Sequence, residues 1–316
     1  MLLGVNMYYN ELRDELIDYY NDINKYKFLK KNYSNYRNIL LNLSNTNIEC
    51  KEGALRYFSN KDVLELYKSY LNKYFKDYLN DFNKTTIEIY NINNLINYIK
   101  ASDEEKHDKK YNYLHLTKEE AEDLLISSGM TDFIFNDIKV VTHKSIVTSL
   151  SICHEYTHKI HNLKSKHKYT DDWYIFTEYL AYYNTYLFGE YLESLGYLSD
   201  ISIAFNYDLI ITISQIKLFK LMDDLYYGNA ISSIDLKIID NSLEIGNIPL
   251  YDYPHLISFI SAKTKYEETK NLSLSIRTKE LEQLLRAKVN SKLLRENNLD
   301  ISDKNTVKKL IMNFTK

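Results

Sequence analysis

Apolar residues recur with helical spacing along most of this chain. Near its start, Met7, Leu12, Leu16 and Ile23 lie between charged and polar positions at intervals that predict a helix over residues 6–32. Only seven glycines and two prolines are present, so little interrupts such helices. The pattern therefore predicts a mainly α fold. The same spacing predicts further helices over 33–43, 51–58, 61–80, 93–100, 118–127, 174–192 and 201–222.

Two short stretches alternate apolar and polar residues instead. Ile87 and Ile89 alternate with polar neighbours, which predicts a strand over 85–90. Residues 132–141 predict a hairpin whose turn lies at Asn136-Asp137. We therefore expect a small β-sheet in an otherwise helical protein.

Composition and charge narrow the classes of protein to consider. The chain is 45% hydrophobic and 26% charged, with a net charge of −3, so it has no basic excess that would favour nucleic acid. The apolar helix over 201–222 contains Asp208, Lys217 and Lys220, which predicts a core helix and no membrane span. No signal peptide is evident, and Cys50 and Cys153 are too few for a disulfide scaffold, so we expect a cytoplasmic protein.

One motif carries chemistry: His154-Glu155-Tyr156-Thr157-His158. Two histidines four residues apart on a helix lie on one face, so both rings can reach one metal ion. Apolar residues precede them, so the histidines should lie inside the protein, where buried imidazoles need partners. Glu155 lies at the edge of that face, where it can take a proton from a metal-bound water. The motif predicts a Zn²⁺ peptidase with His154 and His158 as ligands.

A catalytic zinc needs a third protein ligand and an open fourth position. Glu178 follows His158 by nineteen residues, on the helix predicted over 174–192. A polar loop between the two helices would let the second helix fold back antiparallel and bring its carboxylate to the histidines. We therefore expect one zinc ion held by His154, His158 and Glu178.

The segments 147–161 and 172–181 resemble the catalytic core of the thimet oligopeptidase and oligoendopeptidase F family. That family has His-Glu-x-Gly-His-x-x-His followed by a zinc glutamate on the next helix. The resemblance implies a zincin-like core, ligands His154, His158 and Glu178, and Glu155 as the base. Thr157 replaces the glycine of the family, the spacer to the glutamate is shorter, and the chain has about half the usual length. The wider gluzincin group is therefore the firmer assignment.

Other residues are candidates for subsidiary roles. His161 could hydrogen-bond the zinc carboxylate or bind substrate, or lie in solvent at the helix end. A gluzincin usually stabilises the oxyanion with a tyrosine or histidine. Tyr251, Tyr253 and His255 are the candidates for this role, and they loosely resemble a late Tyr-x-Tyr segment of the oligoendopeptidases.

The strand that ends just before the motif could hold the substrate. Ile138 and Val140 are expected on an exposed edge along which a peptide adds as a further strand. An ordinary core hairpin is the alternative. The expected mechanism has three steps. Glu155 takes a proton from the zinc-bound water, the resulting hydroxide attacks the peptide carbonyl, and Glu155 gives the proton to the leaving amine.

We expect residues 1–110 to form an N-terminal helical region that walls the cleft, and residues 111–316 to form the catalytic region, unless both make one continuous domain. The charge run over 103–110 is a solvated loop or a hinge between them. Three functions remain open: an intracellular oligopeptidase, a narrow-specificity regulatory protease acting on one protein partner, and a non-catalytic zinc-binding interaction protein. The last of these predicts a fourth protein ligand.

Overall fold

The computed structural model describes residues 2–21, 27–101, 116–127, 129–132, 137–165, 170–244 and 253–314. Within these residues the protein is mainly helical with one small sheet, as the apolar spacing predicts. The helices are α1 (Leu2–Asn21), α2 (Lys27–Leu43), α3 (Asn60–Tyr74), α4 (Lys76–Phe82), α5 (Ile92–Lys100), α7 (Lys118–Ser127), α8 (Ile146–Lys164), α9 (Asp171–Leu192), α10 (Leu198–Tyr226), α11 (Ser233–Glu244), α12 (Tyr253–Thr269), α13 (Leu274–Leu285), α14 (Ser291–Glu296) and α15 (Lys304–Phe314).

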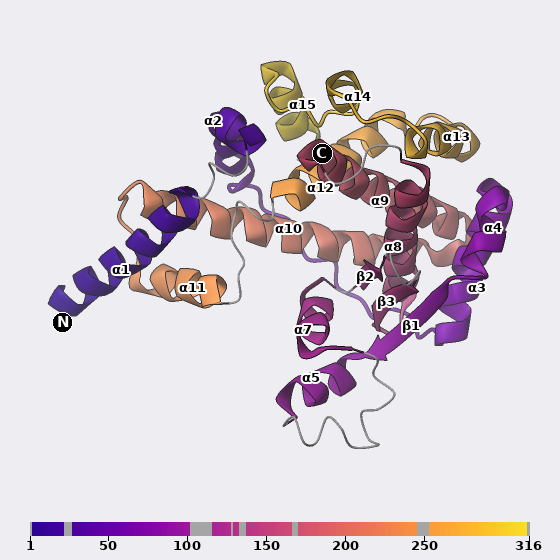
Figure 1. Ribbon diagram of the computed structural model, residues 1–316, viewed down its shortest axis with the longest axis horizontal. Helices are drawn as coiled ribbons and strands as arrows, with labels where there is room; N and C mark the ends of the chain where they lie inside the picture. The colour runs from indigo at the N-terminus through magenta and orange to yellow at the C-terminus, as the bar shows by residue number, and fades with distance from the viewer. Residues whose placement is uncertain are drawn as a thin grey trace.

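The long helix α10 connects the two ends of the molecule. Figure 1 shows α10 running from α1, α2 and α11 on one side to α8 and α9 on the other. A short π-helical turn, Glu193–Tyr197, joins α9 to α10. Gly196 within this turn has φ +93°, a conformation that favours glycine because it has no Cβ. The chain can therefore change direction there and pass from α9 into α10.

The sheet has the strand order β1-β3-β2, with β1 (Thr86–Asn91), β2 (Gly129–Asp132) and β3 (Asp137–Thr142). Strand β1 pairs with β3 in parallel and β2 pairs with β3 antiparallel. The predicted strand is thus confirmed, and the antiparallel pair β2-β3 confirms that a hairpin forms here. The predicted turn position is wrong at Asp137, which is already the first residue of β3, opposite Asp132; Asn136 lies outside the described residues.

Strand β3 is the central strand of this sheet. Strand β1 pairs along one side of it and β2 along the other. Ile138 and Val140 are both 0% exposed and belong to the hydrophobic core. The expectation that these residues form an exposed edge for substrate is therefore wrong, because β1 returns from an earlier part of the chain to cover β3. Among the described strands, β2 is the edge strand on the side of the hairpin.

The expected division at residue 110 lies outside the described residues, as does the charge run at 103–110. Strands from both sides of that division share the sheet, since β1 precedes it and β3 follows it. The larger hydrophobic core also draws on both sides, from Leu12 in α1 to Phe314 in α15.

The predicted helix over 51–58 is wrong. That segment is non-helical, and its main chain is bonded to α10 instead. The Asn206 side chain accepts the Lys51 N–H at 2.7 Å and donates to the Glu49 carbonyl at 3.0 Å. Within the segment, the Asp200 side chain of α10 accepts the Arg56 N–H at 2.8 Å, and the Lys144 carbonyl accepts the Phe58 N–H at 2.9 Å. A helix over 51–58 would have paired these two N–H groups internally, so groups distant in sequence decided the local structure.

The helix predicted over 61–80 is broken between α3 and α4 at Phe75. The helix predicted over 6–32 corresponds to α1 and the start of α2, and residues 22–26 lie outside the described residues. The remaining predicted helices are present, and Thr117 caps α7 by accepting the Glu120 N–H at 3.1 Å. No helix in the described part of the chain combines the length and apolar character needed to cross a membrane.

Candidate metal centre

Helix α8 carries the two histidines of the motif into the interior of the protein. Ser145 caps its start, with its hydroxyl accepting the Val147 N–H. Strands β2 and β3 and helices α3 and α9 all pack against α8. Most of the helix is therefore buried, including residues on faces that an isolated helix would expose. The ring centroids of His154 and His158 lie 4.7 Å apart, as expected for two residues on one helix face.

A side-chain hydrogen bond joins the start of α9 to the end of α8, and α9 packs back against α8. The Thr170 hydroxyl caps α9 by accepting the Trp173 N–H at 3.2 Å. The buried Trp173 indole donates to Ser165, at the end of α8, at 3.1 Å. This connection brings the middle of α9 opposite the histidine pair.

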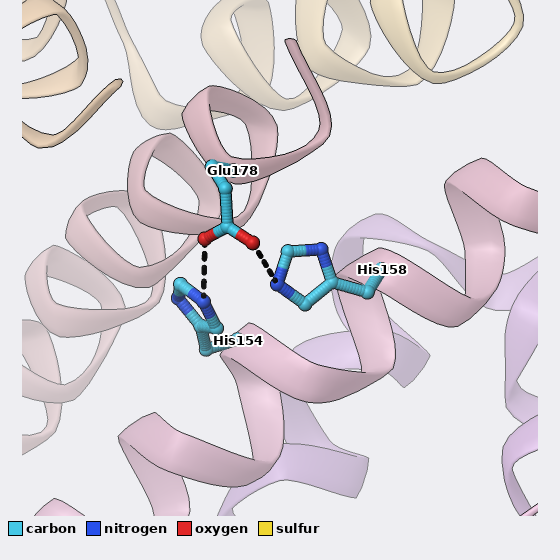
Figure 2. A group of neighbouring side chains, drawn as sticks. All are labelled: His154, His158 and Glu178. Carbon is cyan, nitrogen blue, oxygen red and sulfur yellow. Dashed lines mark ion pairs between the residues drawn. The ribbon is translucent and has the colours of Figure 1, made fainter. Parts of the chain in front are cut away.

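Glu178 projects from α9 toward both histidines (Figure 2). Its Oε2 atom lies 3.5 Å from His154 Nε2, and its Oε1 atom lies 3.4 Å from His158 Nε2. One potential ligand atom from each residue lies within 4.8 Å of the others. The three residues that the sequence predicts as ligands therefore meet at one point in the described structure, and they could hold a metal ion.

The electrostatics of this cluster suit a cation. Burial would raise the pKa of Glu178, but the nearby His158 and His255 outweigh this, and the pKa lies well below its ordinary value. An ionised carboxylate is the form that binds a divalent metal ion.

Further contacts hold the histidine rings. His158 Nδ1 lies 3.3 Å from the Thr177 hydroxyl. A hydrogen bond at Nδ1 fixes the tautomer that presents Nε2 to a metal, as is common for metal-binding histidines. The Tyr182 ring packs edge-on against the His154 ring, with centroids 4.7 Å apart. Both ligands of α8 are therefore oriented by residues of α9.

The Glu155 side chain contacts strand β2 of the sheet. This side chain is buried, and its Oε2 atom accepts a hydrogen bond from the Thr131 hydroxyl of β2 at 2.7 Å. The same hydroxyl lies 2.9 Å from the Glu155 carbonyl oxygen. Glu155 thus lies beside the candidate ligands, held by a residue of the edge strand.

Of the two candidates from the late segment that the structure describes, Tyr253 and His255, only His255 reaches the cluster. Its Nδ1 atom lies 3.1 Å from Glu178 Oε2, and its side chain is 56% exposed. Tyr253, at the start of α12, is buried with its ring edge-on to Tyr36, and burial raises its pKa well above the ordinary value. The core position of Tyr253 argues against its expected contact with an oxyanion, and Tyr251 lies outside the described residues.

His161 does not have its expected position at the surface. It is 0% exposed, and its ring stacks on Trp173 with centroids 5.4 Å apart. The expectation that His161 binds substrate or lies in solvent is corrected by this position, since Trp173 and Phe176 of α9 cover its ring.

The structure also brings to the site residues that the sequence reasoning missed: Gly129, Thr131, Thr177 and Asp208. Thr177 directly precedes Glu178, and Thr131 lies just before the predicted hairpin. Asp208 of α10 is half-buried, and burial raises its pKa to about 6 while the nearby His154 opposes that rise. An acid within an apolar helix was the available signal for Asp208, but it was interpreted only as evidence against a membrane span.

The donor set restricts which metal fits. Two imidazole nitrogens and one carboxylate are the protein ligands of many catalytic zinc sites, whereas Mg²⁺ and Ca²⁺ prefer oxygen ligands. Glu178 Oε2 is buried and, among the described residues, accepts no hydrogen bond of good geometry. A buried carboxylate oxygen of this kind is the group that a cation would satisfy. The residues present therefore fit a zinc ion.

Comparisons with known proteins do not assign the chain to a family. No protein-family model matches the chain, and neither a curated protein nor a solved structure matches it significantly. The site must therefore be interpreted from its own residues.

Proposed function

We propose that the protein is a zinc-dependent metallopeptidase of the gluzincin type. The observation that carries this proposal is the convergence of His154, His158 and Glu178 from two helices, with potential ligand atoms within 4.8 Å of one another. Glu155 supports it, because a buried carboxylate directly after the first histidine has the position of a general base. A site with three protein ligands also keeps a position for water or substrate.

Zinc, when bound at such a site, lowers the pKa of water toward neutrality. Glu155 would take a proton from the water that attacks the peptide carbonyl and would give it to the leaving amine as the peptide bond breaks. His255 is the candidate donor for the oxyanion, because its Nδ1 atom lies 3.1 Å from Glu178 Oε2 and its side chain is 56% exposed beside the candidate ligands.

The arrangement around α8 supports a zincin-like core. The edge strand β2 packs along the helix that carries the motif, and Thr131 contacts Glu155 from that strand. We propose that a substrate peptide adds to the open side of β2, so that its scissile carbonyl lies at the metal. In this proposal β2 is the substrate-binding strand, in place of Ile138 and Val140 of β3.

The particular enzyme that we propose is an intracellular oligopeptidase, with residues 1–110 contributing to the wall of the cleft. This assignment, the cytoplasmic location and the peptide substrate all rest on the sequence. A narrow-specificity regulatory protease would use the same chemistry on one protein partner. A panel of peptides of increasing length, compared with folded proteins as substrates, distinguishes the two.

The direct test measures hydrolysis of a quenched-fluorescent peptide library by zinc-loaded protein. Glu155→Gln should lower turnover by about 10²–10⁴-fold while the protein keeps its zinc, because a general base contributes about that much. Glu52→Gln is the matched control, since Glu52 is exposed and its substitution should change neither property. Full turnover by the Glu155→Gln variant would contradict the assignment.

One observation favours a second function, a non-catalytic zinc protein. His255 Nδ1 lies only 3.1 Å from Glu178, so a small rotation could make it a fourth ligand and close the site. Cobalt-substituted protein separates the two cases by its visible spectrum. An open site changes its spectrum when azide is added, whereas a site closed by four protein ligands does not.

A further inference from the structure

The edge strand β2 lies directly against the general base. Helix α8 packs on this strand, and the two elements meet at Glu155. The Thr131 hydroxyl lies 2.7 Å from Glu155 Oε2 and 2.9 Å from the Glu155 carbonyl oxygen. A hydroxyl has one proton to donate, and the carboxylate is the stronger acceptor because it is charged. The bond to Oε2 is therefore the favoured one.

That bond distinguishes the two oxygens of the carboxylate. Oε2 is engaged by Thr131, while Oε1 accepts no hydrogen bond from any described residue. Oε1 lies beside Gly129 of the same strand, so β2 contacts both oxygens of the carboxylate. The nearby carbonyl oxygen gives the hydroxyl a second acceptor on the same residue, so Thr131 stays in contact with Glu155 even if its proton turns away from Oε2.

Gly129 limits the position of the carboxylate from the same strand. A Cβ atom placed on Gly129 would lie 2.7 Å from Glu155 Oε1 and 2.9 Å from Glu155 Cγ. Both distances are below normal contact, so a Cβ atom at this position would displace the Glu155 side chain. Thr131 and Gly129 together define where the Glu155 side chain can lie.

We infer that Thr131 is a positioning residue that holds Glu155 for proton transfer, and that Gly129 provides the close approach that this contact requires. The inference rests on the proposed function and adds to it the residues that orient the base. Neither residue belongs to the predicted set of ligands and catalytic groups.

The experiment compares Thr131→Val with Thr131→Ser in zinc-loaded protein. Valine has nearly the shape of threonine without the hydroxyl, whereas serine keeps the hydroxyl. Thr131→Val should lower kcat by about ten- to a hundredfold, the effect of a lost hydrogen bond to a charged group, with KM nearly unchanged. Thr131→Ser should recover most of kcat, and both variants should bind as much zinc as the wild type and unfold at a similar temperature.

A second measurement does not depend on turnover. A peptide hydroxamate binds zinc and hydrogen-bonds the catalytic glutamate, so its affinity reports the position of Glu155. This affinity should fall at least about fivefold in Thr131→Val and stay near the wild-type value in Thr131→Ser. Gly129→Ala should also weaken hydroxamate binding, because the new methyl group displaces the carboxylate.

The outcomes separate this inference from the proposed function. If the wild type binds zinc but hydrolyses no peptide, the proposed function fails. If the wild type is active and Thr131→Val keeps its kcat and its hydroxamate affinity, the inference about Thr131 is overturned while the peptidase assignment stands. Equal losses in Thr131→Val and Thr131→Ser would also overturn it, since the hydroxyl would then not be the group that matters.

Discussion

The Thr157 hydroxyl accepts a hydrogen bond from the Asn184 side-chain amide at 2.8 Å, and this bond joins α8 to α9 beside the candidate ligands. The Asn184 carbonyl oxygen in turn accepts a bond from the Tyr70 hydroxyl of α3 at 2.9 Å. All three side chains are buried. Thr157 occupies the position where the resembled family has glycine, and its hydroxyl makes a contact that glycine cannot make.

Replacing Asn184 by alanine should destabilise the protein by about 3 kcal/mol, because two buried partners lose their hydrogen bonds. Urea denaturation of metal-free protein measures the free energy of unfolding. Tyr70→Phe is the matched variant, since it removes only one bond of the chain and should cost about 1 kcal/mol. A loss for Asn184→Ala no larger than that for Tyr70→Phe would show that the network does not join the helices as described.

Alanine at His154, His158 or Glu178 should lower zinc affinity by more than about a hundredfold, because loss of an outer-shell partner alone costs about 10–100-fold. Equilibrium dialysis followed by metal analysis gives the affinity directly. His143→Ala is the control, since His143 is exposed and outside the cluster. Unchanged zinc binding by the Glu178→Ala variant would remove this residue from the ligand set.

His255→Ala should lower kcat by about 10²–10³-fold if His255 donates to the oxyanion, with zinc affinity changed much less. Steady-state kinetics and zinc titration on the same preparations test this. The reverse pattern, weaker zinc binding with normal turnover of the loaded enzyme, would assign His255 to orienting Glu178 through the 3.1 Å contact.

Asp208 should make the metal-free protein less stable as the pH rises. Its pKa is raised to about 6 in the folded protein from an ordinary value of 3.8. Between these two values the unfolded chain releases the proton and the folded protein keeps it, so the stabilisation present below pH 4 is lost as the pH rises through 6. Relative to Asp208→Asn, the wild type should lose about 2 kcal/mol between pH 4 and pH 7.

Urea titrations at several pH values, with a chelator present, measure that difference. The Asn variant is the reference because it cannot titrate at this position. If the difference in the free energy of unfolding between the two proteins stayed constant across this range, Asp208 would have its ordinary pKa in the folded protein.

Much of the fold could be predicted because local patterns determine it. The helical spacing around α7 and the alternation of Ile87 and Ile89 gave elements that the structure contains. The segment over 51–58 could not be predicted in the same way, since the Asn206 side chain binds its main chain from a distant helix. Strand β3 was assigned to an edge because nothing near it in sequence indicates that β1 returns to cover it.

The candidate centre could be predicted from the sequence, which has two histidines one helical turn apart, an acid between them, and a second acid on the next apolar helix. These relations follow from helix geometry and the short connection between α8 and α9, which are local properties. Which other groups meet them depends on tertiary packing. His255, Thr131 and Asp208 come from α12, β2 and α10, and His161 is buried under Trp173. Such contacts depend on how whole elements pack, and packing over long sequence separations leaves no signal in the spacing of neighbouring residues.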